Sequence, residues 1–415
     1  MSAVSAVAMP RPNLLSVLRI RNFALLWSGQ AISQIGDGLF YMAQIWLVLQ
    51  LTGSALAMGT TLVLTILPRL AFQLIGGVSV DRYDRRMMMF LSDSIRSIVV
   101  LIFAILVVTN QIEMIHIYIL SIIFGVISAF FQPAQSALVP NIVPVDSLIA
   151  ANSLRNLTQQ FSQILGPAIA GALIAVPFIG VAGVCFINAG SFALGAIGIW
   201  LMRLPDHLNG ARKANGSFTH DLRDGFRYLL KFRALLLIML LSMALNFAAA
   251  PVDVVLPLFA KNILGQESAG VGILLSSLGI GMVLGSLGIG VWSPHARRGT
   301  LAFTLTTFAG VLFLMVGIIP IFGVTFMLFV VMGAVLAIVN TVLTAVMQEM
   351  IADEYRGRVF SLDALISMGL TPVAMALSGV IADAIGPSIV IIAGGVIVVL
   401  VSLIGLTFRE IRELQ

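Results

Sequence analysis

The stretch "LIGGVSVDRYDRRMMM", residues 74–89, places a cluster of charges between two apolar runs. The charged residues are Asp81, Arg82, Asp84, Arg85 and Arg86. Each flanking run is apolar enough to form a buried helix, so the stretch is typical of a short polar loop between two helices. The same spacing returns 212 residues later, where "GGVSVDRYDRR" (76–86) aligns without a gap with "GIGVWSPHARR" (288–298). This repeat predicts two related halves.

The composition indicates a membrane protein. Of the 415 residues, 59% are hydrophobic and 10% are charged, whereas about 25% of the residues in a soluble domain are charged. The single cysteine, Cys185, excludes an intrachain disulfide and a thiolate metal cluster, and we predict neither a metal nor a cofactor. Residues 1–22 lack the short apolar core and cleavage site of a signal peptide, so we expect the first apolar helix to be retained.

Twelve apolar runs approach the length of about 20 residues that a membrane-spanning helix needs. They start near Phe23, Ala55, Met87, Ile115, Leu154, Phe178, Ala234, Gly270, Thr300, Val324, Leu362 and Ser388. One long polar segment, residues 203–233, follows the sixth run. We therefore predict an all-α membrane protein with twelve transmembrane helices in two pseudo-symmetric six-helix bundles, residues 1–202 and 234–415, joined by a linker at 203–233.

The positions of lysine and arginine predict the orientation, because positively charged loops stay in the cytoplasm. If both termini are cytoplasmic, the cytoplasmic segments hold 19 of the 23 basic residues. A second pair of related positions, Pro167 and Pro372, lies 205 residues apart. Parallel halves of this kind are the architecture of one large transporter class, whose substrate site lies between the halves near the middle of the bilayer.

Polar side chains follow one face of the first span. Gln30, Gln34, Asp37, Tyr41 and Gln44 have spacings of 4, 3, 4 and 3, which place them on one side of an α-helix. One explanation is a hydrogen-bonded seam between helices that only stabilises the bundle. The alternative, which we favour for five polar groups in one line, is the lining of a water-accessible cavity.

Charged residues inside spans are costly and usually face a bundle interior or a wet cavity. Asp37 is our candidate proton carrier, because burial favours the protonated form of a carboxyl group and an approaching cation favours the charged form. The alternative is a permanent ion pair between Asp37 and Arg69 of the second span. Asp93 and Arg96, three residues apart in the third span, are expected to pair with each other.

The second half also carries polar residues within its spans. Asp253 lies two residues after Pro251 in the seventh span, with Asn246 two turns earlier on a similar face. It is a candidate second protonatable site, or else a residue at the outer interface. Other polar positions in the spans are Gln132, Gln135, Asn156, Gln159, Gln163, Asn340, Thr344 and Gln348. Of these we expect Gln159, Gln163 and Asn340, together with Asn246, to border a central aqueous path between the halves.

The loop pattern Gly77-x-x-x-Asp81-Arg82-x-x-Arg85-Arg86 resembles the signature loop of the major facilitator superfamily. The resemblance implies a cytoplasmic loop whose aspartate and arginines hold one half against the other in the outward-facing state. Gly77 would allow a neighbouring helix to approach closely.

A second motif is Gly166-Pro167 with Gly171 in the fifth span, and it resembles the glycine-proline motif of the superfamily's antiporters. Proline removes one helical hydrogen bond and small residues permit a close crossing. The second-half loop departs from the signature, with Ser293 and Pro294 where Asp81 and Arg82 stand.

Longer stretches are similar to the bacterial branch that includes macrolide-efflux and enterobactin-export proteins. They are "FALLWSGQAISQIGDGLF", "FQPAQSALVPNIVPVDSLIAANSL" and "RGRVFSLDAL". The resemblance implies the superfamily's fold, a location in the bacterial inner membrane, and export.

Other functional classes fit the sequence poorly. "QIGDGLF" is similar to the Gly-x-Gly-Asp site of intramembrane aspartyl proteases, but Gln34 replaces the first glycine, and the Tyr83-Asp84 pair follows the other aspartate instead of preceding it. No phosphate-binding Gly-x-x-x-x-Gly-Lys-Ser/Thr motif is present, so we predict that the chain is not an enzyme. A scaffold without transport would lack a continuous polar face.

These patterns together predict a secondary transporter that exports an amphipathic small molecule, such as a macrolide, another drug or a siderophore, in exchange for protons. An importer or a lipid or metabolite flippase of the same fold is the alternative. The predicted partners are the lipid bilayer, a small-molecule substrate and protons, with no nucleic acid, and nothing in the sequence demands more than a monomer.

Overall fold

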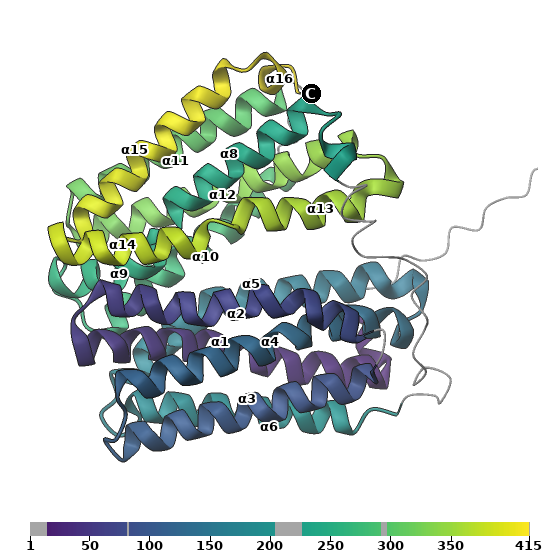
Figure 1. The fold of residues 1–415 in the computed structure, drawn as a ribbon, viewed down its shortest axis with the longest axis vertical. Coiled ribbons are helices and arrows are strands. Elements are labelled where there is room, and N and C mark those ends of the chain that lie inside the picture. The colour runs from purple at the N-terminus through teal and green to yellow at the C-terminus, as the bar shows by residue number, and fades with distance from the viewer. Residues whose placement is uncertain (1–14, 81–82, 204–225, 292–296, 415) are drawn as a thin grey trace, which may run out of the picture.

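The computed structural model describes residues 15–80, 83–203, 226–291 and 297–414. Its first six long helices form one bundle, drawn in purple to teal in Figure 1. They are α1 (Arg21–Thr52), α2 (Ala55–Val80), α3 (Arg85–Val108), α4 (Met114–Ile142), α5 (Leu148–Ile174) and α6 (Gly180–Trp200). Two short 3₁₀ helices, η1 (Ser16–Arg19) and η2 (Val145–Ser147), precede α1 and α5.

The remaining helices form a second bundle, drawn in green to yellow in Figure 1. They are α8 (Arg233–Ala249), α9 (Pro251–Asn262), α10 (Ser268–Val291), α11 (Arg298–Ile318), α12 (Phe322–Met350), α13 (Asp353–Met368), α14 (Thr371–Ile385), α15 (Pro387–Thr407) and α16 (Arg409–Arg412).

Two of the predicted spans are each built from two helices. The seventh is α8 followed by α9, and the eleventh is α13 followed by α14. Pro251 begins α9 and Pro372 lies in the first turn of α14, because proline lacks the amide hydrogen that a helix interior needs. With each broken span counted once, the long helices of the described residues correspond to the twelve predicted runs.

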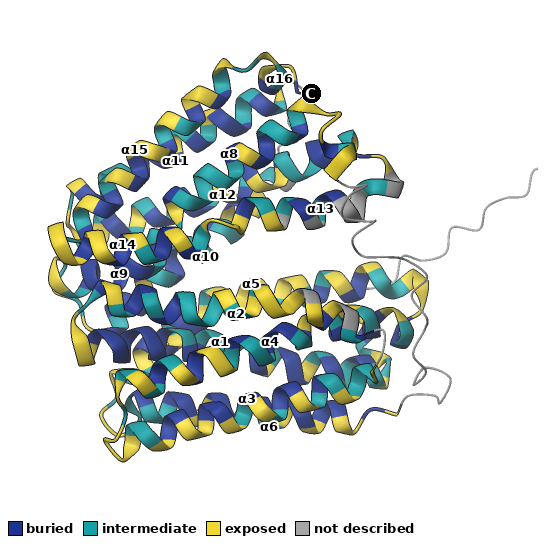
Figure 2. Cartoon of the chain, in the orientation of Figure 1, coloured by how far each residue is buried: buried dark blue, intermediate teal, exposed yellow. Residues whose placement is uncertain are grey.

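Ten helical runs among the described residues are long and apolar enough to cross a membrane. The two long helices outside this group are α1 and α5, and both carry polar side chains along their length. Elsewhere, large apolar side chains are exposed on the outer faces of the bundles, as in α3 and α15 (Figure 2). Such faces are expected where helices meet lipid.

Among the described residues, the apolar packing that joins the two bundles lies toward one end. A single cluster of buried apolar residues there includes Leu49 and Met58 of the first bundle together with Phe259 and Met375 of the second. At the other end each bundle has a separate cluster. We call the first the contact end; it contains the starts of α2 and α10 and the ends of α5 and α14 (Figure 1). The other is the opposite end.

The signature loop lies at the opposite end, and its described arginines bind within their own bundle. Arg85 donates to the Ala137 carbonyl at 3.2 Å. Arg86 donates to the carbonyls of Ile199, at 3.0 Å, and Trp200. These bonds tie the start of α3 to the ends of α4 and α6.

Four residues of the predicted loops lie outside the described residues: Asp81, Arg82, Ser293 and Pro294. A Cβ atom added at Gly77 would meet no atom within 4 Å. No helix of the described chain approaches Gly77 closely in this conformation, in which the bundles are apart at that end.

Candidate functional site

A cavity of about 300 Å³ lies inside the first bundle, between α1, α2, α3 and α4. Its lining residues are Gln30, Gln34, Asp37, Phe40, Tyr41, Gln44, Leu62, Thr65, Ile66, Arg69, Arg96, Ser121, Phe124, Ser128, Phe131 and Gln132. All five residues of the polar face of α1 are in this set. The walls are therefore mixed, with aromatic and aliphatic side chains beside amides, hydroxyls and three charged groups.

The opposite side of α1 is fixed by a close helix crossing beside Asp37. A Cβ atom at Gly166 of α5 would lie 2.7 Å from the Cα atom of Gly38. No side chain fits between the two backbones at this point. The glycine of the antiporter-like motif thus brings α5 against α1 while Asp37, the neighbour of Gly38, lines the cavity.

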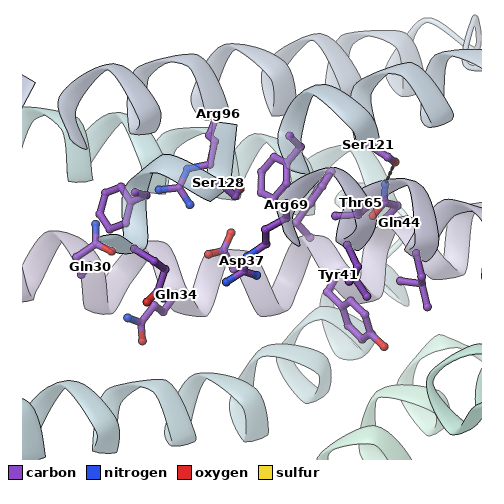
Figure 3. A pocket seen from close by; sticks show the side chains of 16 residues that line it. Gln30, Gln34, Asp37, Tyr41, Gln44, Thr65, Arg69, Arg96, Ser121 and Ser128 are labelled. Carbon is purple, nitrogen blue, oxygen red and sulfur yellow. Dashed lines mark hydrogen bonds between the residues drawn. The ribbon is translucent and has the colours of Figure 1, made fainter. Parts of the chain in front are cut away.

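Asp37 lies between two arginines. Figure 3 shows its carboxylate with Arg96 on one side and Arg69 on the other, and both guanidinium groups attract it electrostatically. Neither arginine forms an ion pair with Asp37 among the described contacts, and its Oδ1 atom is buried without a hydrogen-bond partner. The carboxylate is thus held in a positive environment without being fixed to one cation.

Arg96 is instead paired with Asp93. The two form a salt bridge in which both side chains are buried, and the Nε2 atom of Gln30 donates to Asp93 at 3.2 Å. The guanidinium of Arg96 also lies 4.7 Å from the ring centroid of Phe131 and 4.4 Å from that of Phe192. Two aromatic faces and a carboxylate offset part of the cost of burying this cation.

Several buried polar atoms on the cavity wall have no hydrogen-bond partner among the described residues. They are Gln34 Oε1, Asp37 Oδ1, Arg96 Nε and Ser128 Oγ. Buried polar groups in folded proteins are almost always hydrogen-bonded, and exceptions mark sites for water, ions or ligands. Four such atoms around one cavity therefore indicate a site for a polar ligand or for ordered water.

At the last residue of the polar face of α1, Gln44, the side chain is hydrogen-bonded to α4. The Nε2 atom of Gln44 donates to the Ser121 hydroxyl at 2.7 Å, and that hydroxyl donates to the Ile117 carbonyl at 2.6 Å. Gln44 therefore makes an inter-helix hydrogen bond and, like Ser121, also lines the cavity.

Tyr41 connects the cavity with the second bundle. Its hydroxyl faces the Asp253 carboxylate, which lies in the first turn of α9. The break between α8 and α9 places this carboxylate near a helix N-terminus, where the helix dipole favours negative charge. Broken helices with their ends at a midplane site are a recurring feature of transporters.

Two further contacts join the bundles near this position. The Lys261 ammonium lies 5.5 Å from the ring centroid of Trp46. The Ser268 hydroxyl donates to the Gly171 carbonyl at 3.1 Å. Gly171, the last glycine of the antiporter-like motif, therefore packs against α10 of the second bundle. Helix α5 continues unbroken through Pro167.

The structure places the other predicted lining residues away from this cavity. Gln159 and Gln163 of α5 and Asn340 of α12 are exposed, and Asn246 of α8 is half-buried. None of them lines it. Conversely, the sequence did not single out Thr65, Ser121 and Ser128, because an isolated hydroxyl in an apolar helix gives no periodic signal.

Known proteins resemble the chain over nearly its whole length. Residues 13–414 match the model of a family described as transmembrane secretion effector. Macrolide efflux protein A of Streptococcus pyogenes is 27% identical over 397 residues, 95% of this chain and 97% of that protein. The multidrug efflux pump Tap of Mycolicibacterium fortuitum is 26% identical over 405 residues, 95% of this chain and 96% of that protein.

Solved structures share the fold. A bacterial homologue of the iron transporter ferroportin, in an inward-facing state, superposes with a TM-score of 0.75 at 13% identity, covering 94% of this chain and 99% of that one. The nucleoside transporter NupG gives a TM-score of 0.72, also at 13% identity, covering 93% of this chain and 98% of that one.

Proposed function

Because the chain belongs to the transmembrane secretion effector family of the major facilitator superfamily, we propose that it exports amphipathic small molecules in exchange for protons. It is a transporter and not an enzyme, so no residue has a catalytic role. The relatives that carry the names macrolide efflux protein and multidrug efflux pump support a macrolide-like or other drug-like substrate. The mixed aromatic and polar cavity wall suits such molecules.

The observation that carries the proposal is the unpaired Asp37 carboxylate inside a membrane helix. An ionisable group there is costly and is usually functional. Burial favours the neutral form of this carboxyl group, whereas the two nearby arginines favour its charged form. A proton and a donor group of the substrate would then compete for the same carboxylate, and this competition is the basis of exchange.

Two charged groups beside the cavity, Asp93 and Arg96, would keep the same partners throughout transport. Asp93 and Arg96 are paired and hydrogen-bonded, which leaves Asp37 and Arg69 as the charged groups free to change partners. Arg69 would hold Asp37 in its charged form until substrate or proton arrives. Asp253, which faces Tyr41, is the second candidate for proton coupling and lies where the bundles meet.

The distribution of basic residues supports an orientation. The opposite end carries Arg85, Arg86 and Arg298, whereas the contact end carries Lys261. Under the positive-inside rule the opposite end would be cytoplasmic, with both termini on that side of a bacterial inner membrane. The contact end would then close the outer side, and substrate would enter from the cytoplasm.

The size of the cavity suggests how substrate binds. About 300 Å³ is at the small end of the range for drug-sized ligands. We expect the first bundle to take one polar group with its adjoining apolar part, while the rest of the molecule lies between the bundles. The protein would work as a monomer in lipid, because one chain supplies both bundles.

The first experiment identifies a ligand and then tests coupling. Thermal shifts of the purified protein against a macrolide, a catecholate siderophore, a lipophilic cation and a sugar select the probe. Proton-driven accumulation of that probe is then measured in everted vesicles. The Asp37→Asn variant is expected to lose uphill accumulation while it keeps part of its probe binding.

The matched control is Asp146→Asn, which removes an exposed carboxylate between α4 and α5 outside the cavity. Its accumulation should equal that of the unmodified protein. Unchanged uphill transport by Asp37→Asn would exclude Asp37 as the coupling group. Accumulation that runs only in the opposite direction would identify an importer.

A further inference from the structure

Asp383, near the end of α14, binds the start of α2 across the interface between the bundles. Its carboxylate accepts hydrogen bonds from the Ser54 hydroxyl at 2.5 Å, the Ala55 amide at 2.6 Å and the Leu56 amide at 3.1 Å. Both carboxylate oxygens take part. No feature of the sequence connects this aspartate with residues more than 320 positions earlier.

The contact completes the capping of α2. A helix begins with four amides that have no partner inside it. Here the Ser54 amide bonds to the Thr52 hydroxyl at 3.1 Å, and the Ala57 amide bonds to the Ser54 hydroxyl at 3.2 Å. The two amides between them bond to Asp383. Half of the cap of α2 is therefore supplied by the other bundle, in a position where the helix dipole also favours a carboxylate.

Close backbone packing holds Asp383 in place. A Cβ atom at Gly379, one turn earlier, would lie 2.7 Å from the Cα atom of Leu56. A Cβ atom at Gly59 would lie 2.7 Å from the Met375 carbonyl oxygen. The backbones of α2 and α14 are therefore in direct contact. Any movement that separates the two helices breaks all three hydrogen bonds together, because the length of each bond can change by only a few tenths of an ångström.

We propose that Asp383 is an interbundle cap that sets how readily the contact end opens. Transport by two bundles around one site requires each end to open in turn. Opening the contact end leaves two α2 amides and a carboxylate without their partners until water replaces them. Asp383 therefore favours the conformation seen here over the conformation open at the contact end, and it acts by positioning the bundles without touching the substrate.

Another acidic residue at a helix start on this side offers a contrast. Glu113 precedes α4, and its amide bonds to the Nδ1 atom of His116 in the same helix at 3.1 Å. Both partners belong to the first bundle, so separation of the bundles leaves this helix start unchanged. Glu113→Gln is therefore a matched control that removes a carboxylate from a helix start without affecting the interface.

The test uses a thiol reporter within the interface. Ser268, 3% exposed, is the first residue of α10 at the contact end. In a Cys185→Ala background, the rate at which a membrane-impermeant maleimide labels a Ser268→Cys reporter measures opening of that end. We expect Asp383→Asn to raise the rate about tenfold. Ser54→Ala, which removes one of the three bonds to Asp383 together with the bond from the Ala57 amide, should raise it two- to threefold, and Glu113→Gln should leave it unchanged.

Size-exclusion elution and the melting temperature of each variant establish that it is folded. If Asp383→Asn fails to fold, Ser54→Ala provides the same readout through the milder change. The proposal would be overturned if the folded Asp383→Asn and Ser54→Ala variants were labelled at the same rate as the reporter protein that keeps Asp383 and Ser54. Faster labelling of these variants would uphold the cap even if the unmodified protein transported none of the probes. That second result would reject only the export function, so the two failures are distinguishable.

Discussion

The first and second bundles have related helices and a repeated loop spacing, but they keep charge in different places. Asp37, Arg69, Asp93 and Arg96 lie within the first-bundle helices, around or beside one cavity. In the second bundle, α10 and α15 contain no charged residue. Its Asp253 and Lys261 both lie against first-bundle side chains.

The two bundles thus share their helix packing but differ in where they carry buried charge. Helix packing is retained because every bundle needs it. Buried charge costs several kcal/mol per ion unless it is paired. We infer that most of the exchange chemistry lies in the cavity of the first bundle and that the second bundle adds Asp253 to it.

The largest expected effect comes from breaking the buried pair of the first bundle. Asp93→Ala leaves Arg96 buried without its carboxylate, and the folded state should lose about 3–5 kcal/mol. The double variant Asp93→Leu with Arg96→Leu should recover most of this loss, because no charge then remains. Thermal denaturation and the yield of monodisperse protein measure the effect.

The corresponding change in the second bundle is Glu413→Ala, which removes one partner of an exposed ion pair with Arg409. Exposed pairs contribute little, so no measurable change is expected. An equal loss of stability in Asp93→Ala and Glu413→Ala would remove the contrast between the bundles.

A smaller effect is expected where Tyr41 of the first bundle faces Asp253 of the second. Tyr41→Phe and Asp253→Asn each weaken this one polar contact. Each variant should slow proton-driven transport about tenfold, and the double variant should be no slower than the worse single one.

Tyr118→Phe is the control for this pair, since Tyr118 is a half-buried tyrosine of α4 outside the cavity lining. Its transport rate should be normal. Additive losses in the double variant would show that Tyr41 and Asp253 act separately.

A third, weaker effect should follow from changing the cavity wall. Gln34→Leu removes an amide whose oxygen is buried and unpartnered, and it should lower probe affinity about fivefold, as expected for loss of roughly 1 kcal/mol of hydrogen bonding. Titration of the probe by intrinsic fluorescence measures the dissociation constant. Gln159→Leu, an exposed position on α5, serves as the control and should bind normally.

The smallest effect is expected in the second bundle. Asn340 is exposed and does not line the cavity, so Asn340→Ala should change probe affinity and transport less than twofold. A loss equal to that of Gln34→Leu would place part of the binding site in the second bundle.

Hydrophobic periodicity alone predicted the twelve runs, the polar segment after the sixth, and the polar face of α1. These features depend on the chemistry of one helix and its solvent. The helices α1 and α5 fell outside the ten most apolar runs, because α1 carries the polar face that lines the cavity and α5 carries exposed amides such as Gln159 and Gln163. The polar positions Gln159, Gln163, Asn246 and Asn340 give the same kind of signal, yet they do not line the cavity.

The sequence by itself determined which side of each helix is polar, because the 3.6-residue period places side chains on a face of their own helix. Only the tertiary structure decided which helix that face meets. The position of Asp37 between Arg69 and Arg96, the approach of Tyr41 to Asp253, and the capping of α2 by Asp383 all depend on how separate helices pack. That packing is a property of the whole chain, since each contact joins residues whose separation in sequence carries no periodic signal.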